Sequence, residues 1–268
     1  MPVNSIRQCN KFINSLQGKI YFPYALPTYN EKLNEIFVEL RSNGIVDVEK
    51  EGYKIILSYL TEIMQEAQQS VDEHIQHRFE TGEITDKDQA RKNAAGNVFQ
   101  QFVAYTLSKN IVIGNINKDV VVTTSTKKIL EDYASISVGE DIQKPDSDVL
   151  IYSPSDTNSP IINFSCKTSF RERAGQTYKW KLLCDIAACE CEHKVDNEKC
   201  PANIYRLDYH PQRKIYMCFV TSDFYNEIGQ PQIAGMFNFF DKSFVTKPNV
   251  TGSIESFENV IDFINNIY

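Results

Sequence analysis

The chain has 268 residues, of which 42% are hydrophobic and 24% are charged, and its formal net charge is −7. A chain of this length and composition can bury a large core as one or two domains. The negative charge excludes a protein that coats nucleic acid through bulk electrostatic attraction, because such coating needs an excess of Lys and Arg.

The sequence predicts neither a membrane span nor export. No apolar run approaches the roughly 20 residues that a membrane helix requires, and the start, MPVNSIRQCNKF, lacks the apolar stretch of a signal peptide. We therefore expect a cytoplasmic protein with no membrane partner. The 7 cysteines are an odd set, which favours reduced thiols over a disulfide framework.

The first part of the chain is predicted to be helical. Apolar residues recur at helical spacing over residues 29–81, with a break at Gly44 and a stop at Gly82. We interpret residues 1–85 as a helical N-terminal subdomain.

The second part, residues 86–268, mixes helices with strands. A helix is expected from Asp86 through AAGNVFQQFVAYTLSKN, because acidic residues suit the amino end of a helix. After Gly114, the runs VVVTT, DVLIY, IINFS and KIYMCFVTS are short and β-branched or aromatic, which predicts strands. Further elements expected in chain order are a helix in GQTYKWKLLCDIAACE, a loop in HKVDNEKCPANIY, a short apolar run at Met236–Phe240 and a final helix over Ser253–Tyr268. Together these predict an α/β or α+β fold.

A turn-rich segment, SPSDTNSP, joins two of the predicted strands. It predicts that Asp148–Tyr152 and Ile161–Lys167 are antiparallel neighbours. Such a hairpin brings the start of the first strand next to the end of the second.

Two acids and a lysine at that place are the candidate catalytic groups. Asp146 and Asp148 stand two positions apart, so both carboxylates project from one face of an extended strand. Carboxylate oxygens suit Mg²⁺, which polarises phosphate and helps to ionise water. Ser165 and Lys167 share a face of the neighbouring strand, and Cys166 points the other way. The Lys167 ammonium can then orient water or stabilise developing negative charge.

The ordered set PDSD, hairpin and SCK resembles the PD-(D/E)xK nuclease superfamily, whose motif is Pro-Asp, a spacer, then Asp or Glu, any residue and Lys. The resemblance implies a mixed central sheet flanked by helices and Mg²⁺-dependent phosphodiester hydrolysis. Ser165 stands where the general motif has an acid. Restriction endonucleases that recognise CCGG, or CC and GG separated by a base, commonly carry Ser or Thr there, so the resemblance narrows to that type II group.

Enzymes of that group follow the lysine with a basic residue, an acid and an arginine that read the CC/GG bases. Arg171, Glu172 and Arg173 match this trio. Arginine can donate two hydrogen bonds to guanine, and glutamate can accept from cytosine. Lys179 and Lys181 are further candidates for DNA contact. We expect double-stranded DNA as substrate and a homodimer bound to it, because a palindrome suits a twofold dimer.

The remaining metal ligand is not identified by the sequence. Relatives often carry a glutamate on the helix after the lysine, where this chain has Trp180. Others use a Gly-x-x-Phe-Glu pattern on the helix before the sheet, and its match in GNVFQQF is Gln100. The Gln100 amide oxygen can orient a metal-bound water or bind the metal weakly, although a solvent-exposed glutamine fits equally well. Which of Asp146 and Asp148 is essential also stays open.

Alternative interpretations accompany this one. The basic residues also fit a solvated helix face, or a repair or mobile-element nuclease in which they only grip phosphate. A non-catalytic, cysteine-rich interaction module is a further alternative. It would draw on the potential zinc ligands Cys184, Cys189, Cys191, His193 and Cys200, but their spacing is poor for a zinc knuckle and favours ordinary core cysteines.

Overall fold

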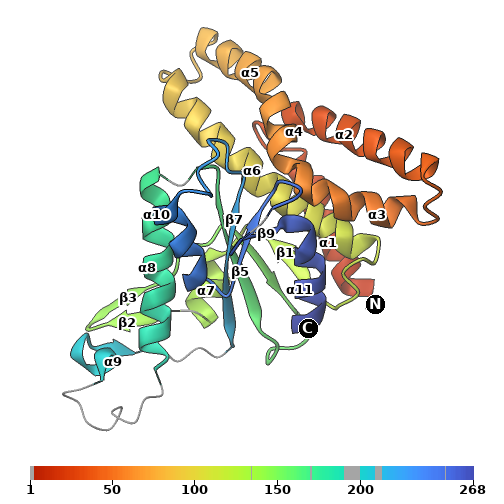
Figure 1. Cartoon of the computed structure of the whole chain (residues 1–268). Coiled ribbons are helices and arrows are strands. Elements are labelled where there is room, and N and C mark those ends of the chain that lie inside the picture. Colours follow the sequence, from red (N-terminus) through yellow and green to blue (C-terminus); the bar gives the residue numbers. More distant parts are fainter. Residues whose placement is uncertain (1–2, 134, 170, 190–199, 209–212, 251) are drawn as a thin grey trace.

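Helices surround a mixed β-sheet in the computed structural model of the chain (Figure 1). The structure describes residues 3–133, 135–169, 171–189, 200–208, 213–250 and 252–268, without the side chains at 3, 132, 133, 171–177, 208 and 232. Within these ranges, none of the helices combines the length and the apolar character needed to pass through a bilayer.

The described residues up to residue 85 are helical, as predicted. Their elements are α1 (Val3–Leu16), α2 (Phe22–Ser42), α3 (Val48–Ile55), the 3-10 helix η1 (Ile56–Tyr59), α4 (Leu60–Glu66) and α5 (Gln68–Glu80). Asp47 caps α3 by accepting a hydrogen bond from the Lys50 main-chain N–H. The predicted break and stop are confirmed, because Gly44 follows α2 with φ 75° and Gly82 follows α5 with φ 77°.

The helix predicted between the break at Gly44 and the stop at Gly82 is not continuous in the structure. The chain tightens into a 3-10 helix at η1 and breaks again at Ala67, between α4 and α5. Three consecutive residues of η1, Ile56, Leu57 and Ser58, are buried, whereas an amphipathic surface helix would expose one of its faces. Contacts on several sides therefore shape this segment, and helical spacing alone did not reveal them.

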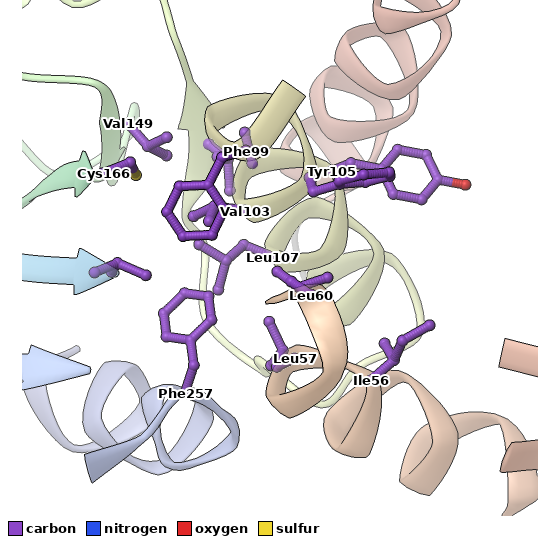
Figure 2. Packing of buried hydrophobic residues seen from close by; sticks show 14 of the residues in the cluster. Ile56, Leu57, Leu60, Phe99, Val103, Tyr105, Leu107, Val149, Cys166 and Phe257 are labelled. Atoms are coloured by element: carbon purple, nitrogen blue, oxygen red, sulfur yellow. The ribbon is translucent and has the colours of Figure 1, made fainter. Parts of the chain in front are cut away.

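Helix α6 (Lys87–Val112) runs through the centre of the molecule (Figure 1). It starts where predicted, with Asp86 accepting a hydrogen bond from the Gln89 N–H at 2.9 Å. Its later turns are buried on every side, because the N-terminal helices pack on one side and the sheet on the other. In Figure 2, Phe99 and Val103 of α6 face Val149 and Cys166 of the sheet.

A six-stranded sheet forms the second layer, with strand order β1-β4-β5-β7-β8-β9. Its strands are β1 (Val121–Thr123), β4 (Val149–Tyr152), β5 (Ile161–Lys167), β7 (Ile215–Thr221), β8 (Lys242–Val245) and β9 (Glu255–Ser256). The predicted hairpin is confirmed, since β4 pairs antiparallel with β5 and places Val149 opposite Phe164. Strands β5, β7, β8 and β9 run parallel, so their carboxyl ends meet at one edge of the sheet. We call this edge, together with the start of β4, the catalytic edge, after the candidate catalytic residues that it carries.

The remaining elements cover the sheet and add a small second sheet. They are α7 (Lys127–Tyr133), α8 (Arg171–Ala187), α9 (Pro201–Ile204), α10 (Pro231–Ala234), the 3-10 helices η3 (Gly235–Phe239) and η4 (Phe257–Asn259), and α11 (Val260–Ile267). The small sheet has the order β3-β2-β6, from β2 (Ile136–Val138), β3 (Asp141–Gln143) and β6 (Leu207–Asp208). The sequence did not predict α7 or this sheet.

One prediction near the carboxyl end needs correction. The final helix begins at Val260 and not at Ser253, because Glu255–Ser256 first pairs with β8 as the edge strand β9. The apolar run at Met236–Phe240 falls mostly in the 3-10 helix η3, and the strand follows it.

The α/β class with a mixed central sheet flanked by helices is confirmed. The division into 1–85 and 86–268 stays a prediction. One cluster of buried apolar side chains extends from α1 through α6 to the sheet, so the described core continues across residue 85.

Candidate active site

The two acids and the lysine meet at the catalytic edge. The Lys167 Nζ lies 3.0 Å from Oδ2 of Asp146 and 3.0 Å from Oδ2 of Asp148. The hairpin produces this meeting, because the Asp148 N–H continues the ladder by donating to the Phe164 carbonyl at 3.1 Å. Cys166 packs in the core cluster with α6, on the opposite face from Lys167. The predicted alternation of side chains is therefore present.

The three side chains differ in exposure. Lys167 is 12% exposed, Asp148 is 23% exposed and Asp146 is 48% exposed. The Cys166 main-chain N–H also donates to Asp148 Oδ2 at 2.7 Å. Asp148 is therefore the more firmly held carboxylate, whereas Asp146 is the one more open to solvent.

Two amide side chains hold the main chain on which these acids stand. Gln100 of α6 donates through Nε2 to the main-chain oxygen of Asp148. Asn163 of β5 donates through Nδ2 to the main-chain oxygen of Asp146 at 3.2 Å. The main-chain oxygens of Asp146 and Asp148 thus each accept from a side-chain amide, which fixes the two carboxylates relative to each other.

Asn163 was missed by sequence reasoning. It is a fully buried amide in the otherwise apolar run IINF, two residues before Ser165 and four before Lys167. A polar residue within an apolar strand, on the same face as the candidate residues, is a signal that could have identified it.

Burial and charge act against each other at this site. Burial raises the pKa of Asp148 above its ordinary value, and the neighbouring Lys167 opposes that rise. Burial by itself would lower the pKa of Lys167, yet the two carboxylates raise it above its ordinary value. The lysine is therefore a stable cation, and two carboxylates around one ammonium carry a surplus negative charge.

This donor set fits a hard divalent cation. Mg²⁺ takes oxygen ligands and is commonly held by one or two carboxylates together with substrate phosphate oxygens. Asp146 and Asp148 supply two such carboxylates on one face. Among the described residues no group of three His, Cys, Asp or Glu side chains is placed to hold a metal, so the structure does not identify a further acidic ligand.

Ser165 and Gln100, which were also predicted to be catalytic, lie next to the acids and the lysine. Ser165 is buried on β5, at alternate positions with Lys167 and Asn163. Gln100 reaches the site from α6 through its amide nitrogen, which donates to the Asp148 carbonyl. The sequence predicted that the Gln100 amide oxygen contacts a metal-bound water or the metal. The contact seen in the structure is from the amide nitrogen to the main chain.

A cavity of about 420 Å³ adjoins Asp146. Lys144 in its wall pairs with Glu131 of α7. Trp180, the residue found where relatives often have a glutamate, is also in the wall. The other lining residues are Thr126, Lys127, Leu130, Pro145 and Ser147.

The candidate base-reading trio forms the first turn of a helix. Arg171, Glu172 and Arg173 begin α8, slightly earlier than the start near Gly175 that the sequence suggested, and their side chains lie outside the described ones. The main chain places them four to six residues after Lys167, at the catalytic edge.

The two lysines further along α8 differ. Lys179 is exposed. The Lys181 side chain is only 12% exposed, and its Nζ lies 2.5 Å from Asp185 Oδ1 and 3.6 Å from Asp241 Oδ1. Lys181 thus holds α8 to the segment before β8, whereas Lys179 is open to a partner.

The cysteine-rich segment is described only in part. Cys184 and Cys200 are buried in an apolar cluster with Ala187 and Leu207, which fits the interpretation as core residues. Burial raises the pKa of Cys184 to about 12. Cys191 and His193 lie outside the described residues.

The second half of the chain matches a family of known proteins. The family model described as BsaWI restriction endonuclease type 2 matches residues 122–267, which is more than half of the 268 residues. The chain belongs to the BsaWI family of type 2 restriction endonucleases. This BsaWI-family enzyme is therefore a type II site-specific deoxyribonuclease, as predicted, and the two alternatives of a repair nuclease and a non-catalytic module are set aside.

A solved structure described as "Restriction endonuclease PspGI-substrate DNA complex" is also similar to this BsaWI-family enzyme. The two share 17% sequence identity with a TM-score of 0.41, over 89% of this chain and 92% of that chain. No curated protein sequence matches the chain.

Proposed function

We propose that this enzyme is a Mg²⁺-dependent endonuclease of the PD-(D/E)xK type that cleaves double-stranded DNA at a palindrome with a CCGG core, or a related CC/GG core. The observation that carries the proposal is the placement of Lys167 at 3.0 Å from both Asp146 and Asp148, at the open edge of the sheet. Family membership supports the class of enzyme, and this geometry supports the chemistry.

The proposed catalytic roles follow from burial and charge. Asp146 and Asp148 bind the cation, which when bound polarises the scissile phosphate and lowers the pKa of water. Lys167 orients the attacking water and stabilises the negative charge that grows on the phosphate oxygens. Ser165 and Gln100 support these groups, and Gln100 does so by holding the Asp148 carbonyl.

Recognition is assigned to the start of α8. Arg171 and Arg173 donate to guanine edges and Glu172 accepts from cytosine amino groups in the major groove. A helix that begins four residues after Lys167 is a suitable support for such contacts, because only three residues connect it to the strand that carries the lysine. Binding as a homodimer lets each subunit read and cut one half of the palindrome.

Contacts to the DNA backbone are assigned to lysines near the candidate site. Lys179 lies on the same helix as the trio and is exposed. The cavity beside Asp146 brings Lys127 and Lys144 to the side of the catalytic carboxylates, where a DNA strand would pass. Lys181 contributes indirectly, since its ion pair with Asp241 links α8 to the segment before β8.

Digestion of a plasmid of known sequence tests the proposal. Purified enzyme with Mg²⁺ should give discrete fragments whose ends map to a CC/GG palindrome, and EDTA should abolish cleavage until Mg²⁺ is restored. Random fragmentation, or sites without a CC/GG core, would reject the recognition part. Cleavage that persists in EDTA would reject the metal part.

A substitution in the trio separates base reading from phosphate gripping. If Arg173 reads guanine, Arg173→Ala should lose about 1–3 kcal/mol of binding free energy on the cognate site alone. An equal loss on every sequence would mean that Arg173 contacts phosphate. Lys179→Ala is the matched comparison, because a backbone contact should weaken binding to all sequences.

A further inference from the structure

The N-terminal helices reach the catalytic edge through a buried hydroxyl group. Thr61 lies in the first turn of α4 and is 3% exposed. Its Oγ1 is 2.6 Å from the main-chain oxygen of Ser222 and 2.8 Å from Oγ1 of Thr246. Thr61 donates its one hydroxyl proton to the Ser222 carbonyl, and the Thr246 hydroxyl, which also lies 3.4 Å from the Thr221 carbonyl, can donate to Thr61 or to Thr221.

Ser222 and Thr246 directly follow β7 and β8, at the catalytic edge. The Ser222 N–H donates to the main-chain oxygen of Lys167 at 3.2 Å, and the Thr246 N–H donates to the Thr221 oxygen at 2.9 Å. Hydrogen bonds therefore run from Thr61 through Ser222 to the main chain of Lys167.

Lys167 depends on these bonds because it is the last residue of β5. Beyond it, the Thr168 carbonyl is held by the Ser222 hydroxyl at 3.1 Å and by the Phe224 N–H at 3.4 Å. A displacement of Ser222 would therefore displace the main chain at Lys167, and with it the ammonium. A misplacement of about 1 Å in a catalytic group can cost a hundredfold in rate.

We propose that Thr61 is a positioning residue for DNA cleavage. Its hydroxyl fixes the carboxyl ends of β7 and β8, and through Ser222 it sets Lys167 between the two carboxylates. The inference rests on the catalytic role proposed above for Lys167. It gives the N-terminal helices a part in catalysis that does not require them to touch DNA.

Ser58 provides a matched control on the preceding turn, in η1. It is also buried, and its Oγ lies 2.6 Å from Ser256 Oγ and 3.0 Å from Glu258 Oε2. These bonds join the same helices to Ser256 of β9, the edge strand on the far side of β8, and to Glu258 of η4. Removing either hydroxyl thus breaks a buried link between helices and sheet, but the link from Ser58 goes to the strand farthest from β5.

Single-turnover cleavage and DNA affinity test the inference. Thr61→Val should lower the cleavage rate constant about tenfold to a hundredfold. Its Kd for the same DNA, measured in EDTA, should stay within about twofold, because no DNA contact is removed. Thr61→Ser keeps the hydroxyl and should restore the rate. Ser58→Ala should lower the melting temperature as Thr61→Val does and leave the rate constant unchanged.

Local hydrogen exchange supplies a second readout. The Ser222 and Phe224 amides should exchange faster in Thr61→Val than in the wild type or in Ser58→Ala. If Thr61→Val does not fold, Thr246→Val removes the partner hydroxyl and should also slow cleavage. A wild-type rate in whichever of these two variants folds, or equal slowing by Ser58→Ala, overturns the inference.

Lys167→Ala separates a failure of the catalytic role proposed for Lys167 from a failure of the positioning role proposed for Thr61. If this variant cleaves DNA as fast as the wild type, the role proposed for Lys167 is wrong, and the positioning role of Thr61 falls with it. If Lys167→Ala is inactive while Thr61→Val cleaves at the wild-type rate, the positioning inference alone fails.

Discussion

The two ends of the β4–β5 hairpin each hold a cation, and they hold it in different ways. At the turn end, the buried Arg213 donates to the main-chain oxygens of Ser153, Asp156 and Ser159. At the catalytic end, Lys167 lies between two carboxylates that are partly exposed.

The difference separates a structural cation from the proposed catalytic one. Carbonyl oxygens belong to the main chain, so Arg213 fixes the path of the turn and has little freedom to exchange partners. The carboxylates around Lys167 are side chains with formal charge, and they can bind a divalent cation as well as the ammonium. We therefore expect substitutions at the turn end to change stability and substitutions at the catalytic end to change rate.

The largest expected effect is that of Lys167→Ala on cleavage. Loss of the ammonium removes proton-transfer assistance and charge stabilisation, which should lower the single-turnover rate constant by about 10³-fold or more. Gel assays of a radiolabelled duplex measure this. A wild-type rate for Lys167→Ala would contradict the proposed difference between the two ends of the β4–β5 hairpin.

Arg213→Met should show the opposite pattern. It removes the donor to the main-chain oxygens of Ser153, Asp156 and Ser159, so the free energy of unfolding should fall by about 3 kcal/mol, while the cleavage rate per folded molecule stays unchanged. Urea denaturation followed by fluorescence measures the first quantity. A slow but fully stable Arg213→Met enzyme would contradict the distinction between the two ends.

The two acids should not be equivalent. Asp148 is the less exposed carboxylate and accepts the Cys166 N–H, whereas Asp146 is nearly half exposed. A preorganised ligand contributes more than a mobile one, so Asp148→Asn should reduce the rate about tenfold more than Asp146→Asn. Mg²⁺ titrations of both variants measure the difference, and a reversed order would make Asp146 the principal ligand.

The smallest effect is expected for Gln100. Gln100→Leu removes the donor to the Asp148 carbonyl and should slow cleavage about threefold to tenfold through misplacement of the carboxylate. The neighbouring Gln101 is the control, because its buried Oε1 has no hydrogen-bond partner among the described residues. Equal effects of Gln100→Leu and Gln101→Leu would show that α6 packing, and not this hydrogen bond, is responsible.

Patterns with a short range were predictable from the sequence. The strand alternation around Ser165 and Lys167 and the turn formers between β4 and β5 are local, and the structure confirms the hairpin that they predict. The caps and stops at Asp86 and Gly82 are local as well. The small sheet was not predictable, because its strands have only two or three residues and because β6 pairs with β2 from a distant segment of the chain.

The amino-acid sequence alone thus determined the pair of acids and the lysine two strand positions after Ser165. It also determined the family resemblance that these residues imply. All of these residues lie within one hairpin, so their chemistry and spacing can be read from a short stretch of sequence. The tertiary structure decided which groups support them. Gln100, Asn163 and Thr61 act through hydrogen bonds to main-chain oxygens, and the partners of Gln100 and Thr61 lie 48 and 161 residues away. No local pattern encodes such partners, since they come together only when α6, α4 and the sheet pack around one core.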